Sequence, residues 1–490
     1  MLFNSIPFLV FFSAFFLFYW FVFQRSLKIQ NLFLLAGSYF FYAWWDWRFL
    51  FLLAGNSLLS YFLGILIYES QCPKRRSFFV FLGLLQSLGV LVLFKYFDFF
   101  IASVSRLLDL FGFEFYPGTL NLILPLGISF YTFRTISYLL DINNGKVQPV
   151  RDWCIFLNYI SFFPSLISGP IDRTNLLVPQ LGSKRSFTYE SGVDGMRQIL
   201  WGLFKKIVIA DNCAEITGDI FSNYEALPGS TLFIGSIFYT IQIYADFSGY
   251  SDMAIGISRL LGFNITKNFD FPFFAQNIAE FWRKWHISLT SWLTDYVFTP
   301  LSIVFRDYGK TGLIMAILVN FTLIGIWHGA NWTFILFGFL HGCYFIPLII
   351  SGSLNKRRKK GKHDTFPALN EWGAMLGTFL LVTLTFVLFR SESPAMALGY
   401  YKKILSPGIF SAPVFNSRTN VAVLCFFCAC LLIAEWKQRY KDHGLQFSKN
   451  GETESARSLS VALRWLTYMA ILCSILVFKN DPRNFIYFNF

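Results

Sequence analysis

Long apolar runs without charged residues recur along this chain, and they limit its fold more than any other feature. Many of these runs approach the ~20 residues that cross a bilayer as a helix. Inside a bilayer only helices and closed barrels satisfy every backbone polar group. Charged residues make up only 14% of the 490 residues, against about 25% in soluble domains. We therefore expect an all-α polytopic integral membrane protein.

The apolar runs predict about 11 transmembrane helices, with re-entrant and interfacial helices between them. The region 150–265 mixes apolar runs with prolines, glycines and acids, so it predicts broken helices beside a watery cavity. We expect N-terminal transmembrane helices (1–118), a core (119–350), and a basic cytoplasmic loop with C-terminal transmembrane helices (351–490). The clearest spans are 7–24, 30–45, 49–68, 77–95, 119–140, 311–327, 330–350, 371–390, 419–436 and 462–478.

The net charge is +13, and the basic residues fall in short clusters between apolar runs. This arrangement is typical of the positive-inside rule and not of a nucleic-acid-binding surface, so no nucleic-acid partner is expected. The clusters at 74–76, 356–362 and 437–441 fit the cytoplasmic side, which places the C-terminus outside. The run 356–362 also has the chemistry to contact the head groups of anionic membrane lipid.

Three of the five histidines, His286, His328 and His341, lie in or beside apolar segments. An ionisable group there is costly and marks a candidate functional site. His328 stands where an apolar span meets a glycine, and its imidazole can accept a proton near neutral pH. In one straight helix His341 would lie about 20 Å further along and on another face. Without third and fourth ligands, no metal site is expected.

The segment 278–296 carries a stripe of large apolar residues at helical spacing, which predicts one amphipathic helix lying at the membrane interface. His286 lies beside this stripe, where it either serves a site or hydrogen bonds to a carbonyl group. The stripe comprises Trp282, Trp285, Leu289, Trp292 and Tyr296.

Two polar insertions interrupt apolar sequence. The segment 246–252 begins and ends with Asp246 and Asp252, and the segment 162–173 ends in Asp172 and Arg173. Groups of this kind either serve a functional site, as a proton relay or as the lining of a binding site, or form a structural polar network that holds broken helices together. The sequence leaves both interpretations open.

Two motifs, FWRKWHISLTSWLTDYVFTPL (281–301) and GIWHGANWTFILFGFLHG (325–342), resemble the membrane-bound O-acyltransferase family. They are similar to its bacterial branch, which includes the alginate O-acetylation protein. The segments 125–141, 162–173 and 246–263 and the terminal NFIYFNF match the same branch, so the resemblance covers nearly the whole chain. It implies a ring of transmembrane helices around a central tunnel, with the catalytic core in 119–350.

The resemblance also implies residue roles. His328 corresponds to the catalytic histidine of the family, and His286 to its second motif histidine. For substrate binding, we expect contributions from Trp327, Asn331, Trp285 and Asp246. No cofactor is expected to be bound, and acetyl-CoA or another acyl thioester is the expected donor substrate.

Together these expectations describe a bacterial enzyme of the cytoplasmic (inner) membrane. It would move an acetyl group from a cytoplasmic thioester to hydroxyls of a cell-surface or secreted polysaccharide, directly or through a periplasmic acyltransferase partner. His328 would act as the general base. D-alanyl-type transfer to a cell-envelope polymer is one alternative. A transporter or channel is another, although the paired repeats typical of transporters are missing. An inactive scaffold would require His328 to be dispensable.

Overall fold

The computed structural model describes residues 1–490 except 114–117, 355–366, 447–453, 479–484 and 487–490. The basic run 356–362 and most of the terminal NFIYFNF motif therefore lie outside the described residues. Throughout the described part every regular element is helical, which confirms the predicted all-α fold.

Six helices in the described ranges are long and apolar enough to cross a membrane. Two shorter apolar helices, Ile6–Val22 and Val461–Val477, accompany them. The count of about 11 transmembrane helices stays a prediction. The six candidate spans are Arg48–Glu69, Pro73–Leu110, Arg306–His328, Trp332–Ile350, Leu369–Arg390 and Arg418–Lys437.

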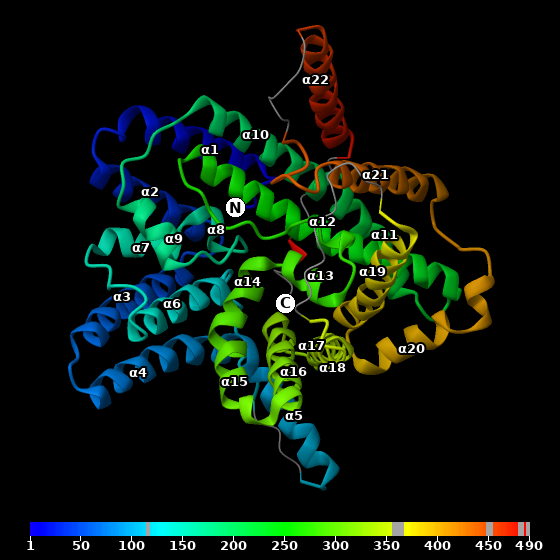
Figure 1. The fold of residues 1–490 in the computed structure, drawn as a ribbon, viewed down its shortest axis with the longest axis horizontal. Helices are drawn as coiled ribbons and strands as arrows, with labels where there is room; N and C mark the ends of the chain where they lie inside the picture. The colour runs from blue at the N-terminus through cyan, green and yellow to red at the C-terminus, as the bar shows by residue number, and fades with distance from the viewer. Residues whose placement is uncertain (114–117, 355–366, 447–453, 479–484, 487–490) are drawn as a thin grey trace. The chain divides into compact units, whose positions relative to one another are not determined.

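The chain divides into two compact units, of which unit 1 comprises 1–195 and 257–266. Within it α3, α4 and α6 pack against one another, and α7 packs against α2, α3 and α9. Its helices, blue to teal in Figure 1, are α1 (Ile6–Leu17), α2 (Leu27–Ala43), α3 (Arg48–Glu69), α4 (Pro73–Leu91), α5 (Phe97–Leu110), α6 (Ile128–Asn143), α7 (Trp153–Ser161), α8 (Phe163–Leu166), α9 (Thr174–Leu181) and the start of α10 (Tyr189–Leu203).

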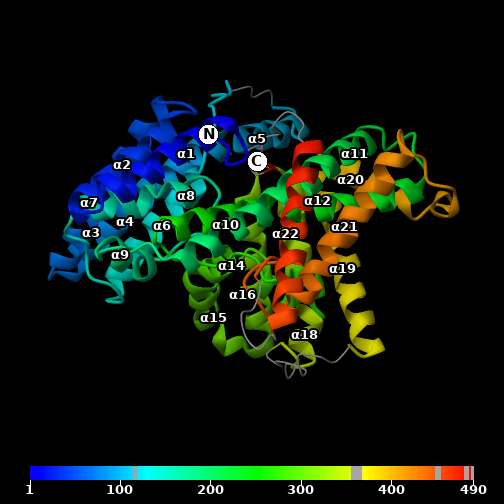
Figure 2. The same cartoon turned by 90° about the horizontal axis from the view of Figure 1, so that it is seen from above.

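Unit 2 comprises 196–256 and 267–490. In it α21 and α22 both pack against the π-helical segment Phe204–Ala210 that continues α10 (Figure 2). Its helices are α11 (Asp211–Ser222), most of α12 (Gly229–Leu260), α13 (Ile278–Lys284), α14 (Ile287–Leu293), α15 (Thr299–Val304), α16 (Gly309–His328), α17 (Trp332–Cys343), α18 (Ile346–Ile350), α19 (Leu369–Arg390), α20 (Pro394–Ile404), α21 (Arg418–Lys437) and α22 (Glu454–Val477).

The helices α16 and α17 form an antiparallel pair (Figure 1). A Cβ built on Gly325 would collide with the backbone of Phe334 and Gly338, and one on Gly338 with the carbonyl of Phe321. The two glycines therefore let the helix backbones approach closely. This pairing places His328, the last residue of α16, at the turn between the two helices.

The expected broken helices are found in only part of the region 150–265. Short helices α7, α8 and α9 confirm the prediction over 153–181. Around Asp246 the prediction is wrong, because α12 runs unbroken for 32 residues. The carboxylates of Asp246 and Asp252 on α12 form ion pairs with lysines. A Cβ on Gly249 would lie 2.8 Å from the carbonyl oxygen of Gly202. Gly249 therefore serves a contact between helices and not a break.

The segment 162–173 forms a structural network inside unit 1. Arg134, on α6, is almost fully buried and donates hydrogen bonds to the carbonyls of Ile160, Ser165 and Pro170 at 3.2 Å each. Its guanidinium lies 3.8 Å from the carboxylate of Asp172. Of the two interpretations left open for this segment, these contacts favour the structural one.

The span predicted at 119–140 is wrong at its N-terminal end. α6 begins only at Ile128, and the described residues 118–127 are not helical. Pro125 disfavours helical conformation in the residue before it. Apolar composition alone therefore overestimated the helix.

Candidate active site

The segment that carries His286 is broken at that residue. α13 ends at Lys284, and α14 begins at Ile287. His286 has φ 45° and ψ 52°, in the left-handed region that residues with a Cβ seldom adopt. The prediction of one continuous helix is therefore wrong, and most of its stripe lies in the protein interior. Four stripe residues are buried: Trp282, Trp285, Leu289 and Trp292.

Asn268 holds this break in place. Its backbone carbonyl accepts the N–H of Ile287 at 2.8 Å. Its side-chain Oδ1 lies 3.1 Å from His286 Nδ1 and accepts the N–H and the hydroxyl of Ser288 at 3.2 and 2.9 Å. Its Nδ2 donates to Ser251 Oγ on α12 at 3.2 Å. One fully buried asparagine thus ties the His286 turn to α12.

Trp327 brings the two motif histidines into one cluster. Its ring lies 5.6 Å from that of His286 and 4.9 Å from that of His328, between ring centroids. The His328 ring also packs edge-on against Phe389 and Phe337, at 5.0 and 5.8 Å. The prediction placed these histidines in separate motifs, and the structure brings both against one tryptophan.

The cluster is closed to water. His286 is 0% exposed and His328 is 3% exposed. Burial lowers the pKa of His286, which lies outside the six candidate spans, to about 3. Its imidazole is therefore neutral at physiological pH and presents one ring nitrogen as an acceptor.

His341 occupies a different place in the same core. It is fully buried on α17, where Trp282 Nε1 donates to His341 Nδ1 at 3.3 Å. Its ring lies 4.6 Å from that of Phe337, which also contacts His328. Within the described ranges, no three His, Cys, Asp or Glu residues cluster closely enough to hold a metal ion.

Two residues predicted to bind substrate also have structural contacts. Trp285 is buried and stacks on Phe281 at 5.3 Å between ring centroids. Asn331 caps α17 by accepting the N–H of Thr333 at 3.1 Å, and its Nδ2 donates to the carbonyl of Glu392 at 2.9 Å. Their roles in binding stay predictions.

Asp246 belongs to a buried ion-pair network. Lys206 Nζ lies 2.7 Å from Asp246 and 3.0 Å from Asp211. The second oxygen of Asp246 accepts the N–H of Ile486 at 2.7 Å, which fastens Ile486 to α12. These contacts favour the structural interpretation of Asp246.

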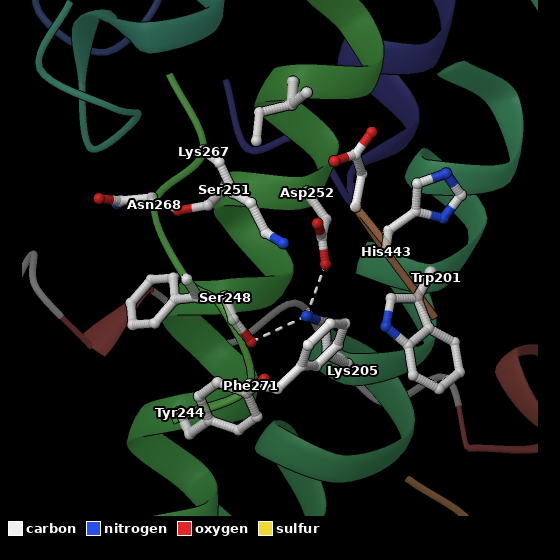
Figure 3. A pocket seen from close by; sticks show the side chains of 13 residues that line it. Trp201, Lys205, Tyr244, Ser248, Ser251, Asp252, Lys267, Asn268, Phe271 and His443 are labelled. Atoms are coloured by element: carbon white, nitrogen blue, oxygen red, sulfur yellow. Dashed lines mark hydrogen bonds and ion pairs between the residues drawn. The ribbon is translucent and has the colours of Figure 1, made fainter. Parts of the chain in front are cut away.

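A pocket with about 310 Å³ of empty space, which includes space open to solvent, lies beside this network (Figure 3). Within it Lys205 pairs with Asp252 at 2.5 Å and donates to Ser248 Oγ at 2.9 Å. The lining residues are Trp201, Lys205, Tyr244, Ser248, Ser251, Asp252, Ile255, Lys267, Asn268, Phe269, Phe271, Asp442 and His443.

Sequence analysis missed several of these polar residues. Lys205 and Lys206 stand directly before the apolar run Ile207–Ala210, and unpaired lysines in such a setting require acidic partners. This was the signal that could have matched them to Asp246 and Asp252. Asn268 gave no comparable signal, because a single asparagine in a polar stretch is ordinary.

Residues 152–387 match the model of the MBOAT, membrane-bound O-acyltransferase family. A "Probable alginate O-acetylase AlgI" of Azotobacter vinelandii is 35% identical over 89% of this chain and 84% of its own length. This chain belongs to the membrane-bound O-acyltransferase family. A protein of the same description from Pseudomonas putida is 34% identical over the full length of both chains. A "Peptidoglycan O-acetyltransferase" of Helicobacter pylori is 31% identical over 96% of this chain and 94% of its own length.

Membership confirms the resemblance and makes the chain a polytopic membrane enzyme of the O-acyltransferase class. His286, His328 and His341 all lie inside the matched range. The family does not by itself assign their roles.

Proposed function

We propose that this enzyme moves an acetyl group from a cytoplasmic thioester, acetyl-CoA or a similar donor, to a hydroxyl of a cell-envelope or secreted polysaccharide. The observation that carries the proposal is the buried cluster in which Trp327 contacts both His286 and His328. Two buried imidazoles close to one tryptophan are suited to proton transfer during attack by a hydroxyl group. The names of the relatives, which concern acetylation of alginate and of peptidoglycan, support this choice of acyl group and acceptor class.

In the proposed reaction His328 is the general base. The acceptor hydroxyl oxygen attacks the thioester carbonyl while His328 takes the hydroxyl proton. The carbon–sulfur bond then breaks, the acetyl group remains on the acceptor oxygen, and the proton passes from the imidazole to the departing thiolate. Proton transfer of this kind contributes about 10²–10⁴ in rate. No net proton, oxidant or metal is consumed.

The proposal includes the surroundings of the reaction. We place the enzyme in the bacterial inner membrane, with about 11 transmembrane helices around a central tunnel. The donor enters from the cytoplasm, and the acceptor lies on the outer side. The immediate acceptor is either the polysaccharide or a periplasmic acyltransferase that passes the acetyl group on.

The test uses the full-length enzyme in oriented vesicles, with radiolabelled acetyl-CoA supplied only on the cytoplasmic face. Labelling of an external polysaccharide or partner by wild type, and none by His328→Ala, is the expected result. Labelling only when acetyl-CoA is supplied outside would overturn the transmembrane route. Movement of unmodified glycan without acetyl transfer would favour a transporter.

A further inference from the structure

The hydrogen bonds around Asn268 determine which ring nitrogen of His286 carries its proton. The backbone N–H of Ser288 can only donate, and it points at one side-chain atom of Asn268 at 3.2 Å. That atom must therefore be the amide oxygen, Oδ1. The amide group then presents Nδ2 to Ser251 Oγ, which is free to accept.

The same oxygen faces His286 Nδ1 at 3.1 Å. Because a carbonyl oxygen cannot donate, the hydrogen bond exists only when Nδ1 carries the proton. In a neutral imidazole the other nitrogen, Nε2, then holds a lone pair. Among the described residues, His286 Nε2 is buried and has no hydrogen-bond partner.

Asn268 is itself fixed from two sides. Its backbone carbonyl accepts the N–H of Ile287, and its Nδ2 donates to Ser251 on α12. Asn268 and Ser251 line the same pocket, where Figure 3 shows their side chains next to each other. The amide group therefore cannot rotate without breaking three or more hydrogen bonds.

We propose that Asn268 is a positioning residue that holds the proton of His286 on Nδ1 and so keeps the buried Nε2 as a hydrogen-bond acceptor. This inference rests on the proposed function for its effect on acyl transfer, but the tautomer itself does not. Asn268 touches no reacting atom and acts only through His286. Its effect should therefore appear in the rate of acyl transfer and not in binding of the donor.

The direct test is ¹⁵N solid-state NMR of the histidine-labelled full-length protein in lipid vesicles. The chain has five histidines, and the signals lost in His286→Asn identify the ring in question. Wild type should show a protonated Nδ1 and an unprotonated Nε2 for His286. In Asn268→Ala the ring should change to the other tautomer or to a mixture of both. A ring that keeps Nδ1–H in Asn268→Ala would overturn the proposal.

The kinetic test separates a positioning role of Asn268 from a nonspecific loss of folded structure. Asn268→Ala should lower kcat by on the order of 10², while the KM for acetyl-CoA changes by less than about twofold. Asn268→Asp keeps an acceptor for Nδ1–H and should recover most of that loss. Its carboxylate should also raise the pKa of His286, which moves the acid limb of the pH profile upward.

Two control variants accompany this test, one at a neighbour of Asn268 and one at a buried asparagine of unit 1. Ser288→Ala removes only one of the three donors to Oδ1, and the two that remain match the two lone pairs of a carbonyl oxygen, so kcat should stay near wild type. Asn158→Ala removes a buried asparagine whose Nδ2 donates to the carbonyls of Asn31 and Cys154 within unit 1. It should lower stability without lowering kcat.

The outcomes are distinguishable. Equal loss of kcat in Ser288→Ala and Asn268→Ala, or no recovery in a folded Asn268→Asp, would overturn the positioning role. If Asn268→Ala changes the tautomer of His286 but not the rate of acyl transfer, Asn268 still fixes the tautomer. That result would instead overturn a role of His286 in the proposed acyl transfer.

Discussion

His286, His328 and His341 are all buried, and each imidazole packs against aromatic rings. Burial alone therefore does not distinguish a catalytic histidine from a structural one. Their contacts differ, because His341 Nδ1 accepts a hydrogen bond from Trp282, whereas His286 and His328 both lie against Trp327.

This difference predicts opposite results for two alanine variants. His328→Ala should lower acetyl transfer by at least about 10²-fold, because the proposed base is lost. His341→Ala should keep most activity and lower the melting temperature of the detergent-purified protein instead. Acetyl transfer and thermal unfolding are measured on the same preparations. Activity of His328→Ala above a tenth of wild type would rule out the general-base role.

His286 offers a second test, because its backbone conformation limits which substitutions fold. Asparagine tolerates the left-handed region better than most residues and can donate to Asn268 Oδ1, but it cannot accept a proton. We expect His286→Asn to keep the melting temperature near wild type and to lose most acetyl transfer. A parallel loss of stability and activity would indicate that the ring only braces the turn.

At the scale of elements, the buried ion pairs join the segment after α10 to α12. Lys206→Met leaves Asp246 and Asp211 buried beside an uncharged partner, which typically costs about 3–5 kcal/mol. The melting temperature should fall strongly. Lys284→Met is the control, because its pair with Glu280 is partly exposed and such pairs contribute at most about 1 kcal/mol. An equal change in melting temperature in the two variants would show that the buried ion pairs stabilise the fold no more than the partly exposed pair does.

The close contact of α12 with α10 predicts the effect of a single methyl group. Gly249→Ala places a Cβ 2.8 Å from the carbonyl oxygen of Gly202, and overpacking of this kind costs about 1–3 kcal/mol. Gly218→Ala on α11 meets no atom within 4 Å and should be neutral or stabilising. Thermal unfolding of both variants measures the difference.

Much of the helical architecture was predictable, because the thickness of the bilayer sets the length of the apolar run that a crossing helix needs. The predicted spans 49–68, 371–390 and 419–436 agree closely with α3, α19 and α21. The error around Asp246 arose because composition does not show which charges are paired. Asp246 and Asp252 look like helix breakers until Lys205 and Lys206 are known to neutralise them.

For the site, the sequence indicated both motif histidines but not their arrangement. The large apolar residues on both sides of His286 follow one helical spacing in the sequence. The periodicity of 278–296 therefore does not reveal the break between the two helices. The partner that stabilises the break, Asn268, lies on the segment between α12 and α13 and precedes His286 by 18 residues. Only the three-dimensional structure brings the two together.

At the scale of the whole molecule, the positive-inside pattern predicts the orientation of the C-terminal part. One apolar helix, α22, lies between the basic cluster 437–441 and the end of the chain. A tag near Lys441 should therefore be cytoplasmic, and a tag after Phe490 should be external. Protease accessibility in intact and permeabilised spheroplasts measures both. Tags on the same face would show that α22 does not cross the membrane.

The paired charges of α12 also affect how the chain is made. α12 has 32 residues and would extend for about 48 Å, longer than the ~30 Å hydrocarbon core. An aspartate that enters lipid unpaired costs about 2.5–3.5 kcal/mol at a helix centre, and α12 carries two, Asp246 and Asp252. Lys205 and Lys206 are synthesised earlier and carry the opposite charge. If α12 enters the bilayer, the lysine segment and α12 would therefore enter it together, as a helical hairpin in which Lys205 and Lys206 offset the charges of Asp252 and Asp246.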